Sequence, residues 1–306
     1  MTIARSTRPV PDSQTRRHVY TFADSASFAR QLARTLGVGS TLVVVHRFPD
    51  AESLVRIRPP AALDAIVVRS LNDPNTKLIE VALAADALRR NGARRVTLVA
   101  PYLSYMRQDT VFAPGEPISQ RVIGTWLGDT FDAVLTIEAH LHRVRLLSEV
   151  VPCRSRSLSA APVLAQWIRH FRSAVYVVGP DEESRPWVQA IARTARLPWI
   201  VCRKQRSGDR TVRIELPALR DCRHAVIVDD MASSGATLAA VARRLHAAGV
   251  LVVDAAVVHA LFEPGALARI RRAGVRRIVS CDTIRHPTNA IRSVPLIAAA
   301  LEAARS

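Results

Sequence analysis

The segment 224–237 constrains the fold of this chain more than any other. An apolar run at residues 225–228 ends abruptly in two carboxylates, Asp229 and Asp230, and a small-residue loop follows. A helical pattern begins next, with its apolar residues on one face and Gly249 after it. This order of buried strand, loop and helix is typical of an open parallel sheet, in which ligands bind beyond the carboxyl ends of the strands.

The loop of this segment combines two kinds of ligand-binding group. The backbone N–H groups of a tight loop and a helix N-terminus favour a phosphate, and Ser233, Ser234 and Thr237 add hydroxyl donors. The two aspartates would repel a phosphate but suit sugar hydroxyls or a divalent cation. The loop therefore predicts a sugar-phosphate site, although a solvated strand end with a helix cap explains these residues about as well.

The remainder of the chain alternates strand and helix patterns. Apolar or β-branched runs predict strands at residues 41–46, 65–70, 95–100, 133–137, 174–178, 199–202, 255–261 and 276–281. Helical patterns follow residue 75 and occupy residues 117–127, 162–171 and 263–271. The alternation predicts an α/β fold with parallel sheets. We expect a disordered tail at residues 1–18 and two domains, 19–152 and 153–306, that meet in a loop at 150–159.

The charge of the chain is strongly positive, with a formal net charge of +17. Nearly all basic residues are arginines spread along the chain, and Lys77 and Lys204 are the only lysines. Aromatic residues make up 5%, too few to suggest stacking platforms for bases. We therefore expect phosphorylated small molecules rather than nucleic acid as partners.

The cysteines and the apolar runs indicate the cellular compartment in which the protein works. The four cysteines are widely spaced and form no metal-finger pattern; they are Cys153, Cys202, Cys222 and Cys281. Reduced thiols fit a cytoplasmic protein best. No apolar run approaches the length of a membrane span, and residues 1–17 lack the apolar core of a secretory signal. The sequence therefore predicts no membrane partner.

Two stretches before residue 110 carry nucleotide-type chemistry. Phe48 offers a face for stacking a base, and Asp50 and Glu52 can accept hydrogen bonds from an exocyclic amine or a ribose. A surface turn is the more frequent origin of such a pattern. In a long loop, Arg107 precedes Gln108 and could hold a phosphate in a forked geometry, although solvated loop arginines are common in so Arg-rich a chain.

Three further sites follow strands. His140 comes directly after the strand at 133–137, and Asp181 comes after the strand at 174–178. Lys204 and Arg206 belong to a basic loop that follows the strand at 199–202. Alone, each has an ordinary explanation: a hydrogen-bonded histidine, an acidic helix cap and a solvated loop.

These motifs, in this order, resemble the ribose-phosphate diphosphokinase family over roughly residues 20–303. Residues 228–237 also look like the phosphoribosyl diphosphate signature of type I phosphoribosyltransferases. The chain departs from the family where glycine or an acid is usual, and where basic residues usually follow Asp109. The departures are Ala51, Thr110, Val111, Ser233 and Ala236. The resemblance implies two tandem phosphoribosyltransferase-like domains with the site between them.

The resemblance also implies an activity: transfer of the diphosphoryl group of Mg-ATP to the 1-hydroxyl of ribose 5-phosphate. It assigns ATP binding to Phe48, Asp50, Glu52, Arg107 and Gln108. It assigns ribose 5-phosphate to Asp229, Asp230, Ser233, Ser234, Gly235, Ala236 and Thr237. It gives the Mg²⁺ cofactor to His140 and Asp181, with Glu138 near the position of a usual aspartate. It gives charge stabilisation during transfer to Lys204 and Arg206.

Family members place the turn at Phe48 across a subunit interface, so the resemblance implies a homo-oligomer. Two alternatives remain. The departures would suit a non-catalytic homologue with a regulatory role. A phosphoribosyltransferase is the other alternative, although that class lacks motifs like those at Phe48 and Arg107.

Overall fold

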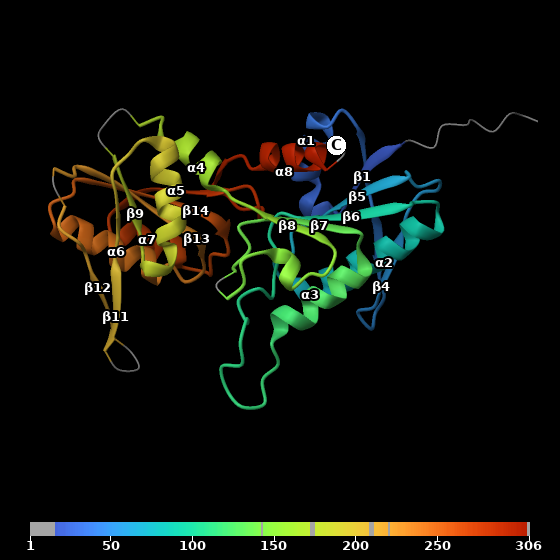
Figure 1. Ribbon diagram of the computed structural model, residues 1–306, viewed down its shortest axis with the longest axis horizontal. Helices are drawn as coiled ribbons and strands as arrows, with labels where there is room; N and C mark the ends of the chain where they lie inside the picture. Colours follow the sequence, from blue (N-terminus) through green and yellow to red (C-terminus); the bar gives the residue numbers. More distant parts are fainter. Residues whose placement is uncertain (1–15, 142, 172–174, 208–210, 220, 305–306) are drawn as a thin grey trace, which may run out of the picture.

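The structure is a computed structural model that describes residues 16–141, 143–171, 175–207, 211–219 and 221–304, and within residues 204–213 it describes backbone alone. Two six-stranded sheets, parallel throughout, form the two halves of the molecule (Figure 1). Helices flank both sheets. The predicted α/β fold with two tandem domains is confirmed.

The first sheet has the strand order β2-β1-β5-β6-β7-β8. Its strands are β1 Arg17–Thr21, β2 Gly39–Leu42, β5 Asp64–Val68, β6 Arg95–Ala100, β7 Ala133–Ile137 and β8 Arg154–Leu158. Its helices are α1 Ala26–Thr35, α2 Pro74–Arg90 and α3 Ser119–Thr130, with 3-10 turns η1 Ala23–Ser25 and η2 Leu147–Glu149.

The second sheet has the equivalent order, β10-β9-β13-β14-β15-β16. Its strands are β9 Val175–Gly179, β10 Trp199–Val201, β13 His224–Ala232, β14 Val252–Ala260, β15 Val275–Cys281 and β16 Asn289–Ile291. Its helices are α4 Ala161–Ile168, α5 Arg185–Ala195, α6 Ala236–Ala247, α7 Ala266–Arg272 and α8 Val294–Ala303, with the 3-10 turn η3 Glu182–Ser184.

Each half also carries one antiparallel hairpin in the same place along the chain. In the first half, β3 Val44–Arg47 pairs with β4 Ser53–Arg56 between β2 and β5. In the second half, β11 Arg203–Ser207 pairs with β12 Thr211–Glu215 between β10 and β13. The two halves are therefore built on one plan, which no repeat in the sequence reveals.

One apolar core joins the halves. It runs from the α1 side of the first sheet to the α4 and α5 side of the second, and α8 packs against α1 (Figure 1). A second core lies between the first sheet and helices α2 and α3, and a third between the second sheet and helices α6 and α7. In the part of the chain that the structure describes, no helix has the length and apolarity of a membrane span.

Several predicted boundaries were wrong, for related reasons. Residues 203–207 of the basic stretch are not a simple loop but form strand β11, and the expected loop at 150–159 contains β8. Both are strands at sheet or hairpin edges, where one side needs no apolar residues, so no apolar run marks them. Pro117 precedes α3 rather than lying in its first turn, and β13 continues through Asp229 and Asp230 instead of ending before them.

Candidate functional site

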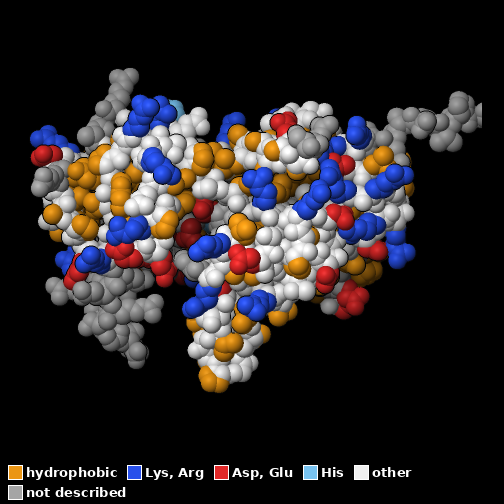
Figure 2. Space-filling view, in the orientation of Figure 1, with side chains coloured by type: hydrophobic (Ala, Val, Ile, Leu, Met, Phe, Trp, Pro, Cys, Tyr) orange, Lys and Arg blue, Asp and Glu red, His pale blue; other side chains and the backbone are white. Residues whose placement is uncertain are grey.

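A cleft of about 360 Å³ separates the two halves, and residues from both line it. Figure 2 shows Asp and Glu side chains inside a hollow between the halves. The cleft contains five of the predicted site residues: Arg107, His140, Asp181, Asp229 and Asp230. Residues that lie far apart in the sequence, before and after residue 150, therefore meet here.

A contact between a histidine and an aspartate joins the halves across this cleft. His140 follows β7 of the first sheet, and Asp230 lies in β13 of the second. The Nδ1 atom of His140 lies 2.9 Å from Oδ2 of Asp230, and their side chains keep 22% and 30% of their surface exposed. The pair therefore links the two halves at a place that a ligand can reach.

The pKa values of the two adjacent aspartates of β13 are shifted in opposite directions. Burial, followed by the nearby charges of Asp230 and Asp181, raises the pKa of Asp229 well above its ordinary value. Burial opposes ionisation of Asp230 as well, but the hydrogen bond and charge of His140 outweigh it and lower the pKa of Asp230. The carboxyl group of Asp229 is therefore the harder of the two to ionise, and a cation bound beside it would favour its charged form.

Glu138 lines the cleft, and His259 contacts Glu138. No pattern in the sequence singles out His259, because it lies inside an apolar strand. Oε2 of Glu138 accepts the backbone N–H of Ala160 at 2.6 Å, and burial raises the pKa of Glu138 to about 7. Burial lowers the pKa of His259 to about 4, so its ring is neutral. The ring lies 3.3 Å from the carbonyl oxygen of Glu138 and 2.9 Å from Oγ1 of Thr283.

The donor groups of this cleft could bind a Mg²⁺ ion only together with other ligands. Among the described residues, no three His, Cys, Asp or Glu side chains converge closely enough to hold a metal alone. Mg²⁺ usually keeps several waters and binds through one or two carboxylates together with substrate phosphates. The surplus of carboxylates around Asp229 fits an ion of this kind, which would arrive with a phosphorylated ligand.

The small-residue loop after β13 is held by residues that the sequence did not single out. Gly235 has a φ of 71°, a left-handed conformation that glycine tolerates, and it is the N-cap residue of α6. Oγ of Ser233 donates to Oε1 of Glu263 at 2.7 Å, and the guanidinium of Arg269 donates to the carbonyl of Ser234. The loop is fixed, and Arg269 adds a cation beside it.

Other predicted residues are not brought into this cleft. Phe48, Asp50 and Glu52 form the turn between β3 and β4, and β4 lies on the opposite side of the first half from β13 (Figure 1). The side chain of Gln108 accepts a hydrogen bond from the hydroxyl of Ser119 and does not line the cleft.

The basic pair Lys204 and Arg206 belongs to β11, and their side chains lie outside the part of the chain that the structure describes. Their predicted role therefore stays a prediction. The backbone of their hairpin is described, and it leads into β13 through β12.

Two family models match most of the chain. Residues 18–129 match the N-terminal domain of ribose phosphate pyrophosphokinase, and residues 156–292 match a phosphoribosyl transferase domain. A ribose-phosphate pyrophosphokinase of Methanopyrus kandleri is 31% identical over 284 residues, which is 92% of this chain and 97% of that protein. The Pyrococcus furiosus ribose-phosphate pyrophosphokinase is 33% identical over 260 residues, covering 84% of this chain and 91% of its own.

The fold has a solved counterpart. A phosphoribosylpyrophosphate synthetase from Mycobacterium smegmatis superposes with a TM-score of 0.82 over 95% of this chain and 99% of its own, at 24% identity. At that identity the match describes the fold alone. The relatives carry the assignment: this chain belongs to the ribose-phosphate pyrophosphokinase family.

Proposed function

We propose that this protein transfers the diphosphoryl group of ATP to the 1-hydroxyl of ribose 5-phosphate in the cytoplasm, giving phosphoribosyl diphosphate and AMP. The observation that carries the proposal is the His140–Asp230 contact across an acidic cleft, in a chain of this family. It joins a residue assigned to the nucleotide side with one assigned to the sugar side. Such transfer depends mainly on positioning and charge stabilisation.

On the sugar side, the carboxylates of Asp229 and Asp230 would accept hydrogen bonds from the ribose 2- and 3-hydroxyls. The loop at 233–237 would bind the 5-phosphate with backbone N–H groups and hydroxyls at the start of α6. The 1-hydroxyl oxygen would then attack the β-phosphorus of ATP, and the bond from that phosphorus to the α-phosphate oxygen would break. AMP leaves with that oxygen.

On the nucleotide side, Arg107 would bind the phosphates from the exposed edge of the cleft. His140 and Asp181 would hold Mg²⁺, which when bound would neutralise charge on the ATP phosphates. Lys204 and Arg206, on the hairpin that leads into β13, would neutralise the charge that develops on the transferred group. Gln108 would have to release Ser119 before it contacted ATP.

The base-binding residues Phe48, Asp50 and Glu52 lie away from this cleft within one chain, so a second copy would supply them. Val44 and Val45 of β3 are 56% and 36% exposed, which suits a hairpin that docks on another subunit. We therefore propose a homo-oligomer as the active form. An active monomer in light scattering would contradict this part.

The decisive assay combines purified protein, ATP, Mg²⁺ and ribose 5-phosphate, and measures AMP and phosphoribosyl diphosphate together. We expect equal amounts of both products, and none when EDTA removes the metal. The variant Asp86→Asn, an exposed change on α2, serves as a matched control and should keep full activity. Tight binding of both substrates without product would instead identify a non-catalytic homologue.

A further inference from the structure

The equivalent strand orders give the molecule a second cleft built like the first. The acidic cleft is lined by residues after β9 and in β13, together with a segment of the other half that follows β7. A second cleft, of about 590 Å³, is lined by residues after β1 and after β5, together with a segment of the other half that follows β15. Because β1, β5 and β15 occupy the places of β9, β13 and β7, the two clefts are counterparts.

The counterpart relation extends to the contact that bridges the halves. In the acidic cleft, Asp230 of one half meets His140 of the other. In the second cleft, the hydroxyl of Ser70, just after β5, donates to the carbonyl of Thr283, just after β15, at 2.6 Å. In each cleft, a polar contact therefore joins the two halves.

The charged side chains that line the second cleft are of both signs: Arg30, Lys77 and Arg285 are basic, and Asp24 and Asp282 are acidic. Lys77 is fully used: its Nζ lies 3.1 Å from the carbonyl of Ser70, 3.0 Å from Asn72 and 3.2 Å from Asp24. Among the described residues, by contrast, the guanidinium groups of Arg30 and Arg285 have no hydrogen bond or ion pair. Both are exposed and line the cleft.

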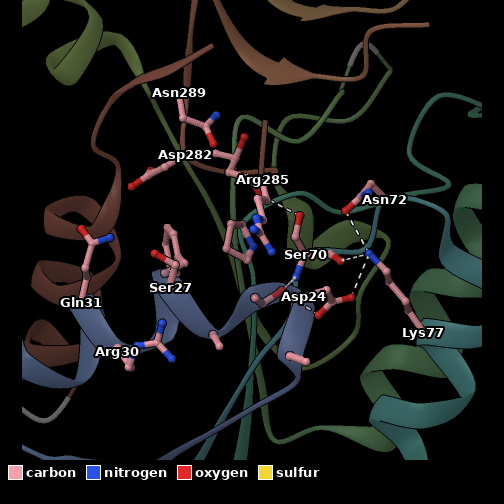
Figure 3. Close-up of a pocket in the computed structure, with 16 residues that line it drawn as sticks. Asp24, Ser27, Arg30, Gln31, Ser70, Asn72, Lys77, Asp282, Arg285 and Asn289 are labelled. Carbon is pink, nitrogen blue, oxygen red and sulfur yellow. Dashed lines mark hydrogen bonds and ion pairs between the residues drawn. The ribbon is translucent and has the colours of Figure 1, made fainter. Parts of the chain in front are cut away.

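The two free guanidinium groups come from different halves. Arg30 lies on α1, and Arg285 lies in the segment after β15; Figure 3 shows the side chains of α1 facing those of this segment across the cleft. Two cations that lie across a cavity, without carboxylate partners of their own, can share one anion. The same cavity would close around that anion from both halves.

Polar groups beside the arginines suit hydroxyls rather than a base. Gln31 and Asp282 line the same space, and Oδ1 of Asp282 already accepts from Ser293 while its other carboxylate oxygen faces the cleft (Figure 3). Phe28 is the aromatic residue of the lining, and with 7% of its surface exposed it offers no ring face for stacking. The volume falls in the range of small-molecule sites.

We propose that the second cleft is a binding site for a sugar phosphate, with the phosphate between Arg30 and Arg285 and the sugar hydroxyls on Gln31 and Asp282. The site is separate from the acidic cleft and does not depend on the reaction proposed above. A series of hydrogen-bonding contacts connects the two clefts. Thr283 contacts both Ser70 and His259, and His259 contacts Glu138.

Isothermal titration calorimetry with glucose 6-phosphate and with inorganic phosphate tests this site. We expect glucose 6-phosphate to bind at least about tenfold more tightly than inorganic phosphate, because the hydroxyl contacts add to the shared phosphate contact. Arg30→Gln and Arg285→Gln should each weaken glucose 6-phosphate binding by about tenfold or more. Arg34→Gln, one turn along α1 and outside the cleft, is the matched control and should bind normally.

The double variant Asp229→Asn with Asp230→Asn separates the two clefts, since it should bind glucose 6-phosphate like the unmodified protein. Thermal unfolding of each variant shows that it is folded. The proposal is overturned if glucose 6-phosphate at about 10 mM does not bind to the protein. It is also overturned if both arginine variants bind glucose 6-phosphate normally, or if the Asp229 and Asp230 variant no longer binds it. Equal affinity for glucose 6-phosphate and phosphate would overturn the assignment of a sugar.

Discussion

The two halves share one strand order, yet the charged residues near the carboxyl ends of the equivalent strands β5 and β13 lie in contrasting environments. After β5, Arg69 is 7% exposed, and its Nη1 lies 2.5 Å from Oε2 of Glu80, which is 2% exposed. At the end of β13, Asp229 and Asp230 stand together, and the described part of the chain supplies them no lysine or arginine partner. The buried ion pair of Arg69 and Glu80 holds the loop after β5 in place. The carboxylates of β13, which have no such cationic partner among the described residues, are instead available to a ligand.

The largest expected effect comes from removing the unbalanced charge. Asp229→Asn with Asp230→Asn should weaken ribose 5-phosphate binding by more than ~100-fold, since two charge-assisted hydrogen bonds contribute ~1.5–3 kcal/mol each. ATP affinity should change little. Calorimetry with each substrate measures both, and an unchanged ribose 5-phosphate affinity would mean that the end of β13 is only a strand end.

The paired hairpins offer the next comparison. Lys204→Ala in β11 should lower turnover by at least about a hundredfold, by analogy with the loss of one preorganised charge-stabilising donor. Substrate affinities should change less, because the affected charge develops in the transition state. Arg206→Ala should behave alike, and the double variant should lose less than the product of the two.

Arg56→Ala, an exposed change in the equivalent hairpin of the first half, is the control for that experiment. It should keep full turnover in the same steady-state assay. A Lys204→Ala enzyme with normal turnover would remove the catalytic assignment of β11 and leave the binding role of β13 untouched.

The balanced charge of the first half predicts a change in stability instead. Glu80→Gln leaves the guanidinium of Arg69 buried without its main partner, which should cost about 3 kcal/mol in the free energy of unfolding. Asp229→Asn should cost little or nothing, because it relieves repulsion with Asp230. Urea unfolding of both variants makes the comparison, and equal losses would contradict the contrast drawn between β5 and β13.

The smallest expected effect concerns the amino-terminal ends of the strands. There each half has a mostly buried aspartate with an arginine partner, Asp64 in the first half and Asp254 in the second. Burial opposes ionisation of both Asp64 and Asp254. Hydrogen bonds and charges from Arg95 and Arg17 outweigh this effect and lower the pKa of Asp64. Arg276 and His224 lower the pKa of Asp254 in the same way. A lowered folded-state pKa gives stability that is present above the unfolded value of 3.8 and is lost as pH falls through the folded value.

Asp64→Asn should therefore destabilise the protein by about 2 kcal/mol near neutral pH. The gap to the unmodified protein should close below pH 3.8. Urea unfolding at several pH values measures this gap for Asp64→Asn and Asp254→Asn. A gap that stayed constant with pH would show that the arginine pairs do not stabilise the ionised form.

The sequence could predict the parts of the molecule that rest on local pattern. The apolar runs of β6 and β7 have one periodicity each, and the bounds of both strands were predicted closely. The order of strand, loop and helix around Asp229 was predicted as well, although β13 extends further than its apolar run. The edge strand β8 and the hairpin β11–β12 were not, because edges lack a continuous apolar run. His259 was missed because only tertiary packing brings it to Glu138.

The packing of α8 on α1 has a consequence for biosynthesis. Helix α8 covers part of the core that the first sheet needs, and its residues, 294–303, are synthesised after the strands of both sheets. At ~5–20 residues per second, the first half would wait on the order of ten seconds for its cover after its own strands are made. During that interval the apolar face of α1 is open, so the nascent chain is a natural client for a holding chaperone. For the same reason, a gene split between the halves would give two fragments that must find each other to fold.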